Sequence, residues 1–340
     1  MNKFSKQIKR VVFIAALGLL SFSTQVQANA WDTYKSRFVT ADGAVIDTGN
    51  NNISHSEGQG YGLMFALAYD DRETFNKILN WTNTHLKNQT NNLFYWSYRP
   101  MENDPVADKN NASDGDLFIA WTLIKAARKW NDSKYRSQAE QITLGLKKFA
   151  VTKFAGLYLL LPGTSGFHNN SSVIINPSYF IFPALQEVSQ YTHLKLWQDV
   201  SNDCYVMIDR ISSELATKVK LVPDWVEMNA QGKVSPAPGW APRSSFDAIR
   251  VPVYLYWLSA TNSHLTPWKE WFSSFEDGKN PAWVNVSTGE TAEYAMTEGL
   301  EAVRKLVLGK LPNTEPEINN NDDYYNASLK LLVYLASKHF

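Results

Sequence analysis

Two carboxylates, Asp114 and Asp116, open the stretch of this chain that is best suited to chemistry. Ser113 forms a capping-box pattern with Asp116, and apolar residues then recur at helical spacing as far as Trp130. The pattern predicts a helix with both acids in its first turn, where the helix dipole and free N–H groups favour ionised carboxylates. Paired carboxylates can perform acid–base catalysis, but acids that only cap a surface helix would give the same local pattern.

Two further segments place an acid and small residues before an apolar helix. Glu57 lies within residues 56–62, where glycines at alternate positions allow close approach of a neighbouring backbone. It would donate a proton near neutral pH only if burial and a nearby charge, such as that of Asp114, raised its pKa. Asp247 precedes Arg250 by three residues, so the two can pair and keep Asp247 ionised. Taken singly, each acid could equally be an ordinary first-turn acid or part of a surface ion pair.

Helical spacing of apolar residues accounts for most of the chain. The predicted helices are 59–69, 72–86, 114–130, 134–149, 177–190, 195–216, 246–259, 267–274, 293–308 and 323–338, and 155–161 is the best strand or hairpin candidate. No linker divides these segments, so we expect one all-α domain of paired helices, either closed into a double ring or open as a solenoid. In a ring of parallel inner helices, the acids at positions 57, 114 and 247 would gather at one end.

The composition excludes several kinds of partner and cofactor. Basic and acidic residues both number 33, so the zero net charge gives no sign of a nucleic-acid partner. Cys204 is the only cysteine and the 6 histidines show no paired ligand spacing, so we expect no disulfide, no metal and no other cofactor. Aromatic residues make up 13% of the chain, and their rigid amphipathic rings suit a ligand such as a sugar.

The first residues have the pattern of a secretory signal peptide. A basic start precedes the apolar run 11–20, and small residues follow at Ala28 and Ala30. We predict cleavage after Ala28, or alternatively after Ala30, and export to the periplasm or the medium. The apolar run is too short to cross a bilayer, and no later stretch approaches the roughly 20 apolar residues that a spanning helix needs.

Together, the acid-bearing segments resemble the signature of glycoside hydrolase family 8. Residues 112–130 match its Ala-Ser-Asp-Gly-Asp start and aromatic end, and residues 56–62 and 244–250 match its other catalytic segments. Other family-like features are residues 176–179, 223–225 and 323–326. The resemblance implies that residues 29–340 form a single catalytic (α/α)6 barrel with an acidic, aromatic-lined cleft at one end.

The resemblance also implies hydrolysis of a glycosidic bond with inversion. Glu57 would be the general acid and Asp247 the general base that activates water. Asp114 would hold the distorted sugar and stabilise positive charge, because inversion needs no covalent intermediate. The implied substrate-binding residues are Trp96, as an aromatic platform, with Tyr179, Arg250, Tyr324 and Tyr325.

Two positions depart from the family pattern. Phe246 stands where the family usually has Tyr, and Thr122 where Ser or Ala is usual. Neither replaces a carboxylate, but the lost hydroxyl at position 246 could alter the position of the water or the sugar.

The layout of a leader and one catalytic domain resembles the periplasmic endo-β-1,4-glucanases that accompany bacterial cellulose synthases. We therefore expect a monomeric endoglucanase that acts on β-1,4-glucan, with the cellulose synthase machinery as a candidate partner. Xylan, chitosan and mixed-linkage glucan are alternative substrates, although the retained Asp247 favours the glucanase-type members. Outside enzymes, the alternatives are a non-catalytic glucan-binding protein and a helical solenoid that binds protein.

Overall fold

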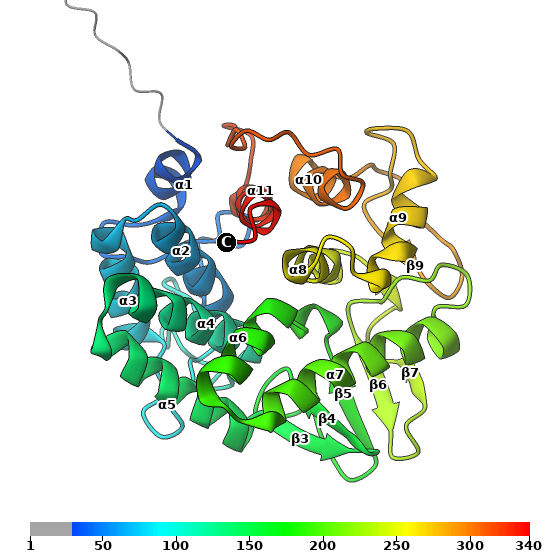
Figure 1. The fold of residues 1–340 in the computed structure, drawn as a ribbon, viewed down its shortest axis with the longest axis horizontal. Helices are drawn as coiled ribbons and strands as arrows, with labels where there is room; N and C mark the ends of the chain where they lie inside the picture. The colour runs from blue at the N-terminus through cyan, green and yellow to red at the C-terminus, as the bar shows by residue number, and fades with distance from the viewer. Residues whose placement is uncertain (1–28) are drawn as a thin grey trace, which may run out of the picture.

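The computed structural model describes residues 29–340, so the predicted signal peptide at residues 1–28 lies outside the described residues. Helices dominate the fold and are arranged in a ring (Figure 1). Their bounds are α1 Ala30–Phe38, α2 Ser56–Ala68, α3 Arg72–His85, α4 Ser113–Trp130, α5 Ser133–Phe149, α6 Phe182–Thr192, α7 Lys195–Arg210, α8 Arg250–Leu258, α9 Thr266–Ser273, α10 Glu298–Val307 and α11 Tyr324–Ser337.

The ring has an inner and an outer layer, which explains why some helices are apolar on every side. Helices α2, α4, α8 and α11 are buried over most of their length, and with α6 they surround the axis of the ring. Helices α3, α5, α7 and α10 bury one face only, as expected for amphipathic helices that cover an inner layer. This architecture is the predicted (α/α)6 barrel.

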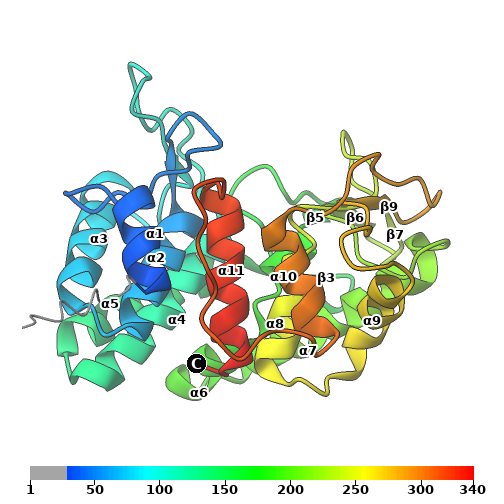
Figure 2. The same ribbon diagram turned by 90° about the horizontal axis from the view of Figure 1, so that it is seen from above.

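Short antiparallel strands lie between the helices. They are β1 Ser54–His55, β2 Ser97–Tyr98, β3 Val151–Phe154, β4 Leu157–Leu160, β5 Ser172–Ile175, β6 Val226–Asn229, β7 Val234–Pro236, β8 Arg243–Ser244 and β9 Val284–Asn285. They pair as β1–β2, β3–β4, β5–β6–β7 and β8–β9. The sheet β5–β7 and strand β9 lie at the end of the barrel where α2 and α11 begin, at the top of Figure 2.

The segment 155–161, predicted as a strand or hairpin, contains strand β4; its hairpin partner β3 lies before the predicted range, and Ala155 and Gly156 at positive φ join the two. Several helix predictions were wrong at an end or in part. The segment 177–190 begins with a separate 3-10 turn, Pro177–Tyr179, before α6, and 195–216 ends in a π-helical turn, Ile211–Leu215. The segment 246–259 becomes helical only at Arg250, and α1 was not predicted at all.

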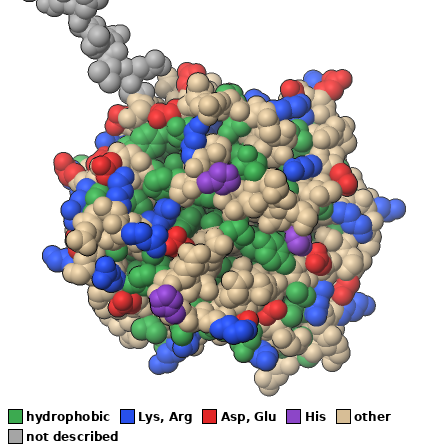
Figure 3. Space-filling view, in the orientation of Figure 1, with side chains coloured by type: hydrophobic (Ala, Val, Ile, Leu, Met, Phe, Trp, Pro, Cys, Tyr) green, Lys and Arg blue, Asp and Glu red, His purple; other side chains and the backbone are tan. Residues whose placement is uncertain are grey.

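Charged side chains of both signs are interspersed around the rim of the face shown in Figure 3, and neither sign dominates there. In the part of the chain from 29 to 340, no helix is long and apolar enough to cross a membrane.

Candidate active site

The first half of the site is formed by the contact between the starts of α2 and α4. The ring of His55 caps α2 by accepting a hydrogen bond from the Gly58 N–H at 3.0 Å, and Glu57 lies in the first turn. A Cβ atom at Gly115 would lie 2.3 Å from Ser56 Oγ and 2.7 Å from the backbone nitrogen of Glu57. Glycine at position 115 is therefore what allows α4 to bring Asp114 beside Glu57.

The capping box predicted for Ser113 and Asp116 was wrong. The N-cap of α4 is Ala112, and Ser113 instead donates its hydroxyl proton to the backbone oxygen of Leu161. Asp116 is fully buried and accepts hydrogen bonds at 2.7 Å from the Phe94 N–H and at 2.7 Å from the Asn111 amide. Burial raises the pKa of Asp116 to about 7, although both donors oppose the shift. The Asp116 carboxyl therefore does not cap the helix. It holds Phe94 and Asn111, which lie before and after Trp96 in the chain.

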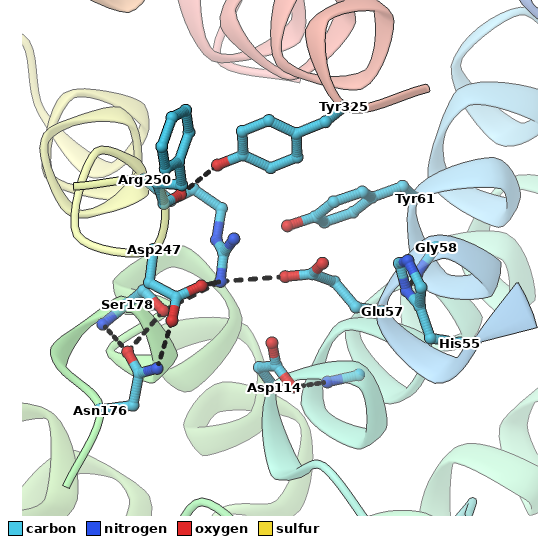
Figure 4. Close-up of polar contacts among 12 residues, drawn as sticks. His55, Glu57, Gly58, Tyr61, Asp114, Asn176, Ser178, Asp247, Arg250 and Tyr325 are labelled. Atoms are coloured by element: carbon cyan, nitrogen blue, oxygen red, sulfur yellow. Dashed lines mark hydrogen bonds and ion pairs between the residues drawn. The ribbon is translucent and has the colours of Figure 1, made fainter. Parts of the chain in front are cut away.

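Arg250 joins the two halves of the site (Figure 4). Its buried guanidinium lies 3.0 Å from Glu57 Oε1 and 3.3 Å from Asp247 Oδ1, and it donates to Ser178 Oγ at 3.0 Å. The predicted pairing of Asp247 with Arg250 is therefore present, and the structure adds Glu57 to it.

The second half of the site is a turn and not a helix start. Asp247 lies in the turn at residues 246–249, immediately before α8, which corrects the predicted helical position. Asn176 donates to Asp247 Oδ2 at 3.1 Å. Asp224 Oδ1 accepts from the Ser245 N–H at 3.1 Å and from the Ala248 N–H at 2.8 Å. The turn is therefore held by side chains from distant segments.

Asp224 is a site residue whose role was not predicted, although its segment matched the family pattern. Burial, and then the negative charge of Asp247, raises the pKa of Asp224 to about 6. The signal in the sequence was an acid between Pro223 and Trp225, but only the fold shows that it faces the turn of Asp247.

The electrostatics of the acid pair differ from the sequence-based expectation. Burial raises the pKa of Glu57, but the charge of Arg250 and that of His55 oppose it, and the net pKa lies below the usual value. Burial and the charge of Glu57 raise the pKa of Asp114 well above its usual value. Of these two neighbouring carboxyls, Asp114 is therefore the one that more readily holds a proton.

The three predicted catalytic acids line one cavity of about 200 Å³. The same cavity is lined by Trp96, Tyr179 and Arg250. Trp96 is half-buried, and its indole Nε1 donates to Asp108 Oδ2 at 2.7 Å, which fixes the ring without covering it fully. The structure thus brings the predicted platform to the acids, and its role in binding sugar stays a prediction.

Tyr324 and Tyr325 lie beside an adjoining cavity of about 350 Å³ that Glu57, Asp247 and Arg250 also line. Tyr324 is only 1% exposed and packs against Tyr34, so its ring belongs to the core. Tyr325 is half-buried and donates its hydroxyl proton to the backbone oxygen of Phe246, next to Asp247. The hydroxyl of Tyr325 therefore ties α11 to the turn that carries Asp247.

The two departures from the family pattern have different surroundings. The Phe246 side chain is exposed and meets the ring of Tyr325 edge-on at 6.5 Å, at the border of the larger cavity. Thr122 is buried in α4 and donates to the Phe118 oxygen at 2.8 Å, so its extra hydroxyl is satisfied within the helix. Only position 246 can affect a ligand directly.

No group of His, Cys, Asp and Glu side chains within residues 29–340 is arranged to hold a metal ion. Cys204 is buried, and burial raises the pKa of its thiol well above the usual value. A thiol of that kind is a poor nucleophile.

Residues 4–339 match the family described as glycosyl hydrolases family 8, and the chain belongs to this family. An endoglucanase from Cellulomonas uda is 45% identical over 281 residues, which cover 83% of this chain and 77% of that protein. A probable endoglucanase from Novacetimonas hansenii is 36% identical over 312 residues, or 91% of this chain and 90% of that protein. The crystal structure of endoglucanase Cel10 from Klebsiella pneumoniae superimposes with a TM-score of 0.88 at 46% identity, covering 91% of this chain and 99% of that one.

Proposed function

We propose that this protein is an endo-acting β-1,4-glucanase that hydrolyses cellulose-type chains with inversion at the anomeric carbon. One observation supports this reaction above all: the largely buried Glu57 and Asp114 and the more exposed Asp247 line one cavity. An inverting glycosidase needs that combination, with a proton donor on one side and a carboxylate with access to water on the other. The relatives named as endoglucanases support glucan as the substrate.

Glu57 would deliver the proton to the glycosidic oxygen as that oxygen leaves the anomeric carbon. Arg250 contacts Glu57 and lowers its pKa, whereas burial beside Glu57 raises the pKa of Asp114, so Asp114 would carry the proton that the pair shares. A sugar hydroxyl that accepts a hydrogen bond from Arg250 would weaken the ion pair and shift the proton from Asp114 to Glu57. Asp114, then ionised, would stabilise the positive charge that develops on the sugar ring.

Asp247 would take a proton from water while the water oxygen bonds to the anomeric carbon. Its side chain is 35% exposed, and Asn176 and Arg250 each contact one of its oxygens, which orients the carboxylate. Inverting enzymes hold the acid and the base roughly 6.5–9.5 Å apart, so that a water fits between the base and the sugar. One nitrogen of the Arg250 guanidinium contacts both Glu57 and Asp247, so it lies between the proposed acid and the proposed base.

The substrate is tested by measuring the reducing ends released from a panel of soluble polysaccharides. We expect the largest activity on carboxymethyl cellulose, with a rapid fall in viscosity because cuts within the chain shorten it quickly. Greater activity on xylan, chitosan or mixed-linkage glucan would replace the substrate assignment but keep the reaction. Binding of glucan without release of reducing ends would instead support a non-catalytic binding protein.

We also propose that the protein is exported, with the signal peptide cut after Ala28. The contacts of the residues that follow support this site over Ala30. Asn29 caps α1 by accepting from the Asp32 N–H at 2.8 Å, and the Ala30 N–H donates to Glu315 at 3.2 Å. A cut after Ala30 would remove both bonds. Amino-terminal sequencing of the mature protein should begin at Asn29; a start at Trp31, or an intact leader, would contradict the proposal.

An association with cellulose synthesis, and a monomeric state, are further parts of the proposal. The leader-and-domain layout supports the first, and the interspersed charges of the surface in Figure 3 are compatible with the second. Light scattering of the purified protein should give a mass close to that of one chain. Deleting the gene should change the amount or order of the cellulose made by the cell; unaltered cellulose would remove the link without affecting the activity.

A further inference from the structure

Trp240 has an unusual position for a large aromatic side chain. It lies between β7 and β8, in the segment that leads to Asp247, and 44% of it is exposed. Part of the indole is therefore open to contact by a ligand. Its backbone is not loose, because the Trp240 N–H donates to the Ala237 oxygen at 3.0 Å and closes a turn.

The Trp240 ring is the outer member of a row of aromatic rings from separate segments. It stacks on Trp225 at a centroid distance of 5.0 Å with 23° between the planes. Trp225 in turn stacks on Phe167 at 5.9 Å and 13°, and meets Tyr179 edge-on at 6.4 Å. Rings held in this way are pre-oriented, so a ligand that stacks on them loses little of its binding free energy to ordering.

The row is continuous with the site. Tyr179, at its inner end, lines the cavity that contains Glu57, Asp114 and Asp247. Two ring contacts lead from that cavity to Trp240. The strands β6 and β7, which flank this row, lie at the same end of the barrel as the start of α2 (Figure 2). A polymer that crosses the cavity toward these strands would therefore pass over the row.

We propose that Trp240, supported by Trp225, forms a distal subsite that stacks against a glucose unit of a chain whose scissile bond lies at the acids. The inference rests on the proposed function, because it takes β-1,4-glucan as the ligand. The flat apolar faces of glucose units in such a chain fit an indole ring, and their equatorial hydroxyls remain at the edge in water. The subsite acts on long chains only, because a short oligosaccharide that fills the cavity does not reach Trp240.

The test compares the chain-length dependence of kcat/KM between the wild type and Trp240→Ala, from cellotriose to cellohexaose and on carboxymethyl cellulose. Loss of one stacking contact should lower kcat/KM on the longest substrates by about threefold to tenfold, with little change on the shortest. Trp240→Tyr should restore most of the loss, since it retains a ring. Phe149→Ala is the matched control, because Phe149 is an exposed aromatic at the end of α5 that lines neither cavity.

The outcomes separate this inference from the function on which it rests. If the wild type cleaves none of these substrates, the proposed function is wrong. If the wild type cleaves them and Trp240→Ala lowers kcat/KM equally at every length, or at none, the distal subsite is refuted and Trp240 only stiffens its turn. A folded Trp225→Ala variant with the same length-dependent loss would support the row as the platform.

Discussion

The half of the site that carries Glu57 and Asp114 differs from the half that carries Asp247 in both local structure and exposure to water. The difference suits the roles proposed for these carboxyl groups. Glu57 and Asp114 lie in the first turns of two buried helices, which are in contact through Gly115. Asp247 lies in a turn outside any helix and is held by side chains. The Glu57 side chain is 18% exposed, whereas that of Asp247 is 35% exposed.

This contrast shows how one fold can supply both a proton and a water. Burial favours a proton on one carboxyl of the pair, because removing it would leave two negative charges in a site with little water. A base that activates water needs the opposite surroundings, namely exposure to water and partners that keep it ionised. Arg250 connects the halves, so neither carboxylate is an unpaired charge.

The largest expected effect is that of Glu57→Gln. The amide retains the shape and the contact with Arg250 but has no proton to donate to the leaving oxygen, so kcat should fall by about 10² to 10⁴. Steady-state kinetics would measure the loss, and binding of cello-oligosaccharides should persist. Near-normal activity in a variant that unfolds at the wild-type temperature would remove Glu57 from the acid role.

The packing of the two halves can be compared by stability. Gly115→Ala should reduce the free energy of unfolding by roughly 1–3 kcal/mol, because the new methyl group meets the backbone of Glu57. Asp224→Ala should also reduce it by roughly 1–3 kcal/mol, because the N–H groups of Ser245 and the buried Ala248 lose their acceptor. Chemical denaturation would measure both. An unchanged free energy of unfolding in either variant would show that the contact tested does not hold its half of the site together.

The shared proton of the acid pair is tested by the pH dependence of Asp114→Asn. In the wild type, activity should be lost as pH rises and the pair loses its proton. In the variant only Glu57 can hold a proton, and its pKa lies below the usual value, so the alkaline limb of kcat/KM should move to lower pH. Asp116→Asn, in the same turn of α4 but not lining the cavity, is the control and should leave the limb in place. An unmoved limb in Asp114→Asn would contradict the shared proton.

The smallest expected effect is that of Trp96→Ala. Loss of a half-buried platform ring should weaken the binding of long glucans by about threefold to tenfold, with little loss of stability. Isothermal titration with an inactive Glu57→Gln background would measure the binding, and thermal unfolding the stability. A variant that loses much of its stability would show that Trp96 is part of the packing and not a binding surface.

The spacing of apolar residues was enough to predict paired helices, but it left a closed ring and an open solenoid as alternatives. The barrel was implied only by the resemblance to the family, and the difference between an inner helix such as α2 and an outer one such as α10 became clear in the structure. The residues of the acid half were also predictable, since Glu57 and Asp114 sit beside glycines that allow close packing. What failed were features that depend on distant contacts. The Asp116 carboxyl accepts a hydrogen bond from the Phe94 N–H instead of capping its own helix. The spacing of residues in the sequence does not reveal such a partner.

The state of Glu57 could not be predicted for the same reason. The sequence places a first-turn acid beside Asp114, which suggests a raised pKa, but Arg250 comes from a helix that begins 193 residues later. Its charge is the largest of the influences that oppose burial and together lower the pKa of Glu57, whereas the pKa of Asp114 is raised. The turn of Asp247 depends similarly on Asn176 and Asp224, which only the folded chain brings together.

The central claim is that a proton from the buried half and a water held by the exposed half act on opposite faces of one sugar. The most direct measurement is proton NMR of the products during the first minutes of cellopentaose cleavage, before the anomers interconvert. We predict that the α-anomer appears first and that Asp247→Asn abolishes its appearance. If the β-anomer appears first, or if a glycosyl ester forms on Asp114, the enzyme retains configuration, and the assignment of Asp247 as the base is wrong.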